Sequence, residues 1–269
     1  MKATADSPAL TSIVTADSRA PVFQIVYWLR AAYGFARYLC RTILRHTVAL
    51  IFGLLVAPVE IGFLAIFQKS FFTPARLAFV APGLTFYTIL ATTLVSTPCH
   101  MVMMKETKLL RRFRASPLPT SALAVGMVCG SGMVSLTSSV ATYLVAHAVS
   151  SVPFPEHLFA TALVWVIALA TMASYGMVVA SLFSRVQNAI AAALPVLFLN
   201  IGLSGLLFQP GAMPRGVSYM SWVTPARPMC DWLRAVATSQ PTPVSWEPAL
   251  ALVWLATLGW LAVRRFEWE

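Results

Sequence analysis

Long apolar runs alternate with short polar segments along this chain. A helix needs about 20 mostly apolar residues to cross the hydrocarbon core of a bilayer. The pattern predicts six such spans, at residues 46–67, 79–102, 121–146, 158–183, 189–208 and 248–263. It therefore predicts an all-α polytopic membrane protein.

Two segments precede the first span. Residues 1–20 are polar and lack the apolar centre of a cleavable signal, so we expect a disordered cytoplasmic tail. In residues 21–45, arginines recur on one helical face at Arg30, Arg37, Arg41 and Arg45. Such a helix is expected to lie in the membrane interface, with residues 46–269 forming the six-span domain.

Composition agrees with a membrane protein, because 58% of the residues are hydrophobic and only 10% are charged. Soluble domains average about 25% charged residues. The net charge of +10 does not indicate nucleic-acid binding, because the basic residues lie mainly between apolar runs. The four cysteines are scattered and form no cluster with histidine, so we expect no metal site.

The distribution of Lys and Arg predicts the orientation. The N-terminal segment, the loops after the second and fourth spans and the C-terminal tail hold fourteen of the nineteen basic residues. Loops on the cytoplasmic side carry the excess of positive charge. Both termini are therefore expected to be cytoplasmic.

The loop after the second span is basic, and we expect a short helix at about 103–116. Apolar Leu109, Leu110 and Phe113 fall on one helical face, and Pro117 stops the helix. A positive retention signal would explain the charges but not the apolar edge. The charged members of the segment are Lys105, Glu106, Lys108, Arg111, Arg112 and Arg114.

The connection before the last span is long, amphipathic and interrupted by prolines. Two short re-entrant helices at about 209–240 on the outer side would explain this mixture, since irregular backbone within a membrane must be sheltered by protein. A soluble external loop is the alternative.

Few polar residues fall inside the predicted spans. A charged carboxylate within a membrane span costs free energy, so Glu60 is a candidate for the substrate pathway. A structural role is the alternative. Asn200 is expected to find an interhelical partner or to line a cavity. Asn200 and Phe208, which ends the same span, are further candidates for the substrate pathway. Gly126 and Gly130 permit close helix packing, either static or as a sliding seam.

Two separated motifs resemble those of the ABC-2 permeases, the membrane subunits of ATP-binding cassette exporters. The basic loop is similar to the family pattern Glu-x-Gly-Thr-x-x-x-Leu-x-x-Thr/Ser-Pro-Leu, with Lys108 and Leu109 in place of Gly-Thr. The outer segment matches a second pattern, in which Pro210 is displaced by one position. Its matching residues are Ser204, Gly205, Phe208, Met213, Pro214, Pro225, Asp231, Leu233 and Arg234.

The resemblance is strongest to small daunorubicin-resistance-type permeases, and it implies a half-transporter in a bacterial cytoplasmic membrane. Two permeases, identical or paralogous, would pair above two ATPase subunits. The 103–116 helix would be the coupling helix that contacts the ATPase. The chain holds no Gly-x-x-x-x-Gly-Lys-Ser/Thr motif, so ATP and Mg would be bound by the partner subunits.

The residues favour export of a hydrophobic or amphipathic compound such as a drug, antibiotic or lipid, because the spans contain few charges. A polysaccharide or teichoic-acid exporter of the same superfamily is the nearest alternative. An ion-coupled secondary transporter would need a charged site at the membrane midplane, for which Glu60 alone is thin support. No catalytic triad or His-Glu-x-x-His motif indicates an enzyme.

Overall fold

A computed structural model of the chain describes residues 21–45, 74–109, 120–150, 153–205, 215–238 and 246–265. All the regular secondary structure in these ranges is α-helical. The helices are α2 (Pro21–Arg45), α4 (Pro74–Glu106), α6 (Thr120–Ser150), α7 (Leu158–Ser181), α8 (Val186–Leu203), α9 (Arg215–Ser221), α10 (Ala226–Thr238) and α11 (Glu247–Arg264).

Five of these helices are long and apolar enough to cross a membrane: α4, α6, α7, α8 and α11. They overlap the last five predicted spans, so the prediction of an all-α polytopic membrane protein is confirmed. The first predicted span, residues 46–67, lies outside the described residues.

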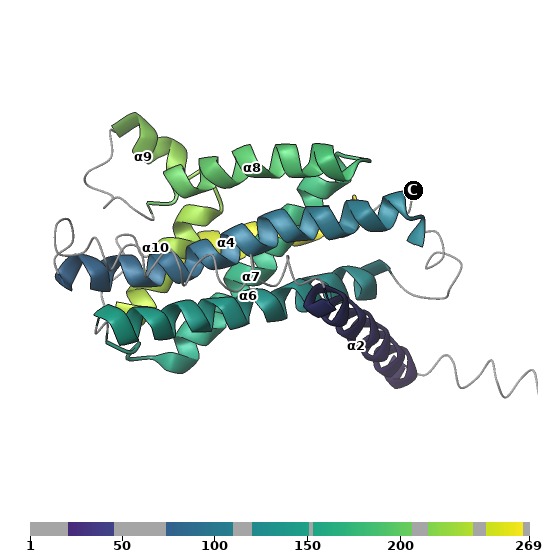
Figure 1. The fold of residues 1–269 in the computed structure, drawn as a ribbon, viewed down its shortest axis with the longest axis horizontal. Helices are drawn as coiled ribbons and strands as arrows, with labels where there is room; N and C mark the ends of the chain where they lie inside the picture. Colours follow the sequence, from purple (N-terminus) through teal and green to yellow (C-terminus); the bar gives the residue numbers. More distant parts are fainter. Residues whose placement is uncertain are drawn as a thin grey trace, which may run out of the picture.

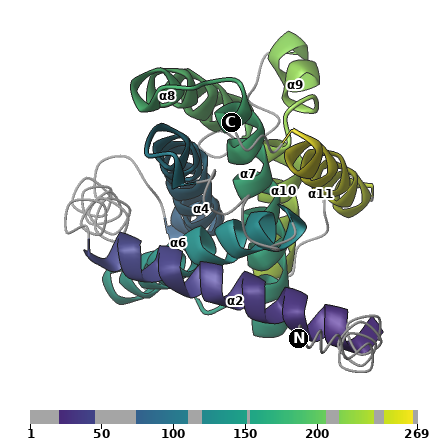
Figure 2. The same ribbon diagram turned by 90° about the vertical axis from the view of Figure 1, so that its right-hand side faces the viewer.

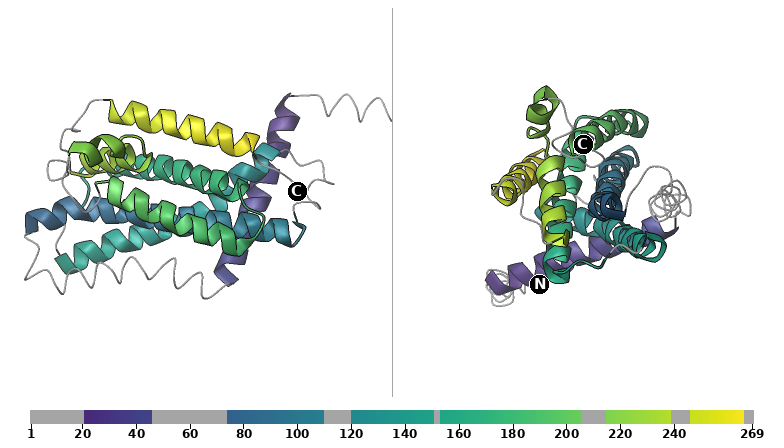
Figure 3. Two further views of the ribbon diagram at one scale, coloured as in Figure 1. Left: turned by 90° about the horizontal axis from the view of Figure 1, so that it is seen from above. Right: turned by 90° about the vertical axis from the view of Figure 1, so that its left-hand side faces the viewer.

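Helices α2 and α9 lie at opposite ends of the bundle (Figures 1 and 3). Helix α2 runs across one end, which we name the α2 end, where α4 and α11 also finish. Helix α9 lies at the opposite end, the α9 end. Because α2 crosses the direction of the long helices, it has the orientation expected of a helix that follows a membrane surface.

Helix α4 is the centre of the bundle and packs against α6, α7, α8 and α10 (Figure 2). Its contact with α6 is a seam of small hydroxyl residues. The Thr92 hydroxyl donates to Ser135 Oγ at 2.7 Å, and the Ser139 hydroxyl donates to the Thr85 carbonyl at 3.3 Å. Hydroxyl side chains allow close approach and also satisfy each other inside an apolar bundle.

Gly126 and Gly130 of α6 pack closely against α2. A Cβ added at Gly126 would lie 2.8 Å from the Ala32 carbonyl oxygen of α2, and one at Gly130 would lie 2.7 Å from Leu39 Cβ. The indole N–H of Trp28 also donates to Ser121 Oγ at 3.0 Å. The Gly126/Gly130 pair therefore allows α2 to pack closely against the bundle.

Candidate transport elements at the two ends of the bundle

Helix α4 ends at Glu106 in a tight turn at the α2 end. Residues 103–106, the first part of the predicted coupling segment, form the last turn of α4, and Lys108 follows with φ 55°. This left-handed conformation favours glycine. The turn is kept although lysine stands where the family pattern has glycine. The remaining predicted coupling residues lie outside the described ranges, namely Leu110, Arg111, Arg112, Phe113, Arg114 and Pro117.

Glu106 joins the end of α4 to the start of α8. Its Oε1 accepts a hydrogen bond from the backbone N–H of Val186 at 2.8 Å. The residue in the N-cap position of α8, Arg185, makes no side-chain capping hydrogen bond. A carboxylate at a helix N-terminus satisfies an otherwise unpaired N–H and interacts favourably with the positive end of the helix dipole.

An apolar cluster lies beside this solvent-exposed contact. Met101 and Met104 of α4, Met177 of α7 and Ala189 of α8 are buried together, with Leu109 and Val186 packed against them. A cavity of about 310 Å³ also opens between α2 and the end of α4. Its lining residues are Tyr38, Leu39, Thr42, His100, Met103, Met104, Thr107 and Leu109.

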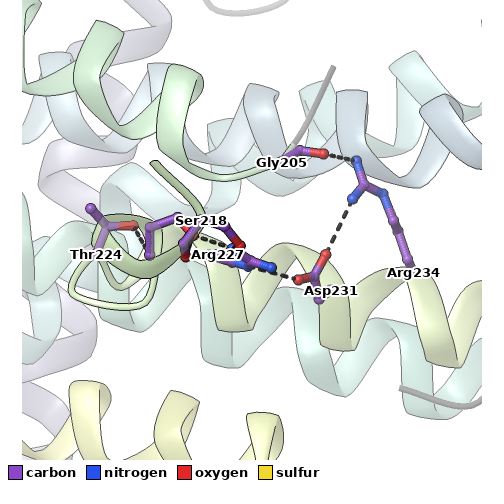
Figure 4. A network of polar contacts seen from close by, with 7 residues as sticks. Gly205, Ser218, Thr224, Arg227, Asp231 and Arg234 are labelled. Carbon is purple, nitrogen blue, oxygen red and sulfur yellow. Dashed lines mark hydrogen bonds and ion pairs between the residues drawn. The ribbon is translucent and has the colours of Figure 1, made fainter. Parts of the chain in front are cut away.

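A cluster of charged side chains lies within α10 at the α9 end (Figure 4). Arg227, Asp231 and Arg234 are only 4%, 3% and 6% exposed. The Asp231 carboxylate lies 3.4 Å from Arg227 Nε and 3.2 Å from Arg234 Nη1. The spacing of four and three residues places all three side chains on one face of the helix.

Each arginine also contacts another element. Arg234 Nη2 donates to the Gly205 carbonyl just after α8 at 2.9 Å, and Arg227 Nη1 donates to the Ser218 carbonyl of α9 at 3.0 Å. Arg227 also donates to Ser221 Oγ and stacks 4.3 Å above the Trp222 ring. The charges on α10 therefore fix the positions of α9 and of the end of α8.

Burial shifts the titration of two residues on α10. Burial raises the pKa of the Asp231 carboxyl, and the neighbouring Arg234 and Arg227 act in the opposite direction. Burial also raises the pKa of the Cys230 thiol to about 12. Cys230 is therefore a thiol of low reactivity while α10 is in place.

Several predicted residues of the outer motif come together here. Ser204 and Gly205 follow α8, Pro225 directly precedes α10, and Asp231 and Arg234 belong to the charged cluster. Met213, Pro214 and Phe208 lie outside the described residues. Sequence reasoning did not single out Arg227, although its spacing from Asp231 and Arg234 on an amphipathic segment was the available signal.

The two polar candidates within the spans have different outcomes. Asn200 is fully buried, and its side-chain amide donates to the Val196 carbonyl of its own helix at 2.8 Å. This intrahelical bond differs from the interhelical partner expected for the amide, because a carbonyl one turn earlier is within reach on α8 itself. Glu60 lies outside the described residues.

Comparison with known proteins identifies a family. The family model described as ABC-2 type transporter matches residues 24–237, well over half of the chain. The matched region includes both the Glu106 contact and the charged cluster on α10. No curated protein matches the chain.

Proposed function

This chain belongs to the ABC-2 type transporter family, and on that premise we propose that it exports a hydrophobic or amphipathic compound, driven by ATP hydrolysis on separate subunits. Membership of the family and five apolar helices make the chain a membrane-embedded transporter permease. Proteins of this family normally work with ATP-binding cassette subunits. The drug, antibiotic or lipid class of the cargo and the daunorubicin-resistance-type subdivision are the finer parts of the proposal.

The absence of charge inside the described spans is the observation that carries the cargo class. Apolar spans were found within α4, α6, α7, α8 and α11. Every charged residue of these spans is one of the first two or last two residues of its span. These residues are Lys105, Glu106, Glu247 and Arg264. A pathway between such helices offers apolar walls and hydroxyl groups, which suit a lipophilic molecule better than an ion.

The proposed orientation places the α2 end in the cytoplasm. Described basic residues gather at that end on α2, on the turn after α4, at Arg185 and after α11. At the α9 end, Arg227 and Arg234 are paired with Asp231, and Arg76 and Arg215 are the other described basic residues. This asymmetry supports cytoplasmic termini by the positive-inside rule.

We assign the contact with the ATPase subunits, named here the motor contact, to the segment that begins with the turn after α4. Lys108 and Leu109 open this segment, and Phe113 is its expected apolar anchor. ATP and Mg would be bound by the partner ATPase and would supply the energy for the change between inward- and outward-facing states. Transport then requires the cargo to bind the two states differently.

A second permease is the proposed partner within the membrane. Helix α8 exposes Leu194, Phe198 and Leu199, and α11 exposes Val253 and Trp260. Lipid or a second permease would cover these apolar side chains. Either an identical or a paralogous permease could cover these apolar side chains.

The decisive experiment is to purify the chain with its cognate ATP-binding cassette subunit and reconstitute the complex in liposomes. ATP-dependent movement should be measured for a lipophilic dye, a fluorescent phospholipid and a polysaccharide. We expect movement of the dye or the phospholipid, abolished when the ATPase lacks its phosphate-binding lysine. Movement of the polysaccharide alone would refute the cargo class, and movement driven by an ion gradient without ATP would refute the exporter.

The motor contact is tested with Phe113→Ala and Arg112→Ala. Truncation of a buried anchor costs roughly 1–3 kcal/mol of binding, whereas a rim charge acts mainly at low salt. We therefore expect Phe113→Ala to weaken association with the ATPase at all salt concentrations and Arg112→Ala only at low salt. Full association and coupling in Phe113→Ala would leave the loop with a topological role only.

A further inference from the structure

Helix α8 receives its N-terminal capping contact from another helix. The Glu106 carboxylate at the end of α4 accepts the Val186 N–H at 2.8 Å, while Arg185 is extended and provides no side-chain cap. A serine, threonine, asparagine or aspartate at the N-cap would normally cap the first turn from within the helix, by accepting the N–H of its second or third residue. The position where α8 begins therefore depends on the position where α4 ends.

The C-terminal end of α8 is held in the complementary way. Arg234 of α10 donates to the Gly205 carbonyl at 2.9 Å, just beyond the C-cap residue Ser204. Cations are favourable at the negative end of a helix dipole, as anions are at the positive end. Each end of α8 is thus contacted by a side chain whose charge is opposite to that end of the helix dipole. Glu106 contacts the N-terminal end, and Arg234 contacts the C-terminal end.

Between its ends, α8 is only lightly embedded in the described bundle. Its buried residues are Ala189, Ala193, Leu197 and Asn200, which form one narrow face. Three of these four side chains are small or of medium size, so they lock the helix less firmly than large side chains would. Leu194, Phe198 and Leu199 on the other side are more than 40% exposed. A helix with this pattern can be displaced without repacking many large side chains, and Pro195 interrupts its backbone hydrogen bonding midway.

We propose that Glu106 is a positioning residue for transport, which transmits displacement of the segment after α4 along α8 to Arg234 and the outer pair α9–α10. The proposal rests on the proposed function, because it assigns the ATPase contact to that segment. Motion at the α2 end shifts the N-terminus of α8 through the Glu106 carboxylate. The Gly205 carbonyl at the other end then moves relative to Arg234, and the charged cluster on α10 rearranges.

The test separates transmission from simple helix capping. Glu106→Ala removes the contact, and Arg185→Ser added to it gives α8 a cap of its own. Glu156→Ala, at an exposed acidic residue between α6 and α7, is the matched control. All variants are purified with the ATPase and compared for subunit association, cargo moved per ATP hydrolysed and hydrogen exchange in the first turn of α8.

Transmission gives a specific pattern. Glu106→Ala should retain ATPase association within twofold, exchange faster at the start of α8 and move at least fivefold less cargo per ATP. The double variant Glu106→Ala/Arg185→Ser should recover slow exchange but not transport, and Glu156→Ala should resemble the original chain. Recovery of transport in the double variant would reduce Glu106 to a local cap and overturn the proposal. Loss of ATPase association in Glu106→Ala would make it a motor contact and would overturn it also.

A second readout does not depend on the identity of the cargo. Cys230 is buried on α10 beside the charged cluster, so its alkylation, measured by peptide mass spectrometry, reports displacement of α10. A non-hydrolysable ATP analogue should change the alkylation rate at least threefold in the original complex and leave it unchanged in Glu106→Ala. Equal nucleotide responses in the two proteins, or no response in either, would overturn transmission. A response without movement of any cargo would refute the proposed cargo class while supporting transmission.

Discussion

Adding one methyl group to α6 at the α2 contact tests how α2 is held. In Gly126→Ala the new Cβ would lie 2.8 Å from the Ala32 carbonyl oxygen and 2.9 Å from Phe35 Cδ1. In Gly130→Ala it would lie 2.7 Å from Leu39 Cβ. Real Cβ atoms do not approach other heavy atoms so closely, so α2 must move away.

The expected size follows from two opposing effects. Overpacking costs about 1–3 kcal/mol, while replacement of glycine by alanine inside a helix gains about 0.5–1 kcal/mol. The net loss at the α2 contact is on the order of 1 kcal/mol, which corresponds to about fivefold faster opening of that contact. Gly259→Ala in α11 is the matched control, because an added Cβ there meets no described atom within 4 Å.

Hydrogen–deuterium exchange of the purified chain measures this contact directly. Peptides from α2 should exchange about fivefold faster in Gly126→Ala and Gly130→Ala, with α7 peptides unchanged. Gly259→Ala should leave α2 unchanged and slightly protect α11. If Gly126→Ala leaves α2 exchange at the level of Gly259→Ala, then α2 is held by the membrane surface and not by the glycines of α6.

Three further outcomes are expected. Lys108→Gly should relieve the strain of the left-handed backbone at Lys108 and stabilise the chain by about 1 kcal/mol, which raises Tm by about 2–4 °C. Lys108→Ala should not raise Tm. Equal Tm values for the two variants would contradict backbone strain at Lys108. Asp231→Asn should destabilise the chain by about 3–5 kcal/mol, because Arg227 and Arg234 lose their buried counter-charge, and a melting temperature unchanged from the original chain would refute this. The pKa of Cys230 is raised to about 12, so its thiolate fraction and alkylation rate should rise about tenfold per pH unit from pH 7 to 10; a plateau near pH 9 would show an ordinary exposed thiol.

The long helices followed from the sequence because their cause is local. About 20 consecutive apolar residues must find a non-aqueous environment wherever the rest of the chain lies. The close-packing role of Gly126 and Gly130 was also visible, because the absence of a side chain can be read from the sequence. The sequence did not show which helix packs against these glycines, since α2 could have packed against either of two faces of α6.

The contacts between distant elements were not predictable in the same way. Glu106 was recognised as part of a motif, but its bond to Val186 joins residues 80 positions apart and depends on the packing of α4 against α8. The cluster on α10 is an intermediate case. The spacing of Arg227, Asp231 and Arg234 predicts mutual pairing on one helical face, but the Gly205 carbonyl enters only through the folded arrangement.

The pairing of charges within α10 has a consequence for biogenesis. In the proposed orientation, α9 and α10 are carried across the membrane during insertion, together with three arginines, Arg215, Arg227 and Arg234, and one aspartate. Because Asp231 lies four residues after Arg227 and three before Arg234, both ion pairs need only the coiling of α10 itself and no other helix. The translocating segment then carries one net positive charge from this cluster, and the energetic barrier to its crossing is reduced in advance of folding.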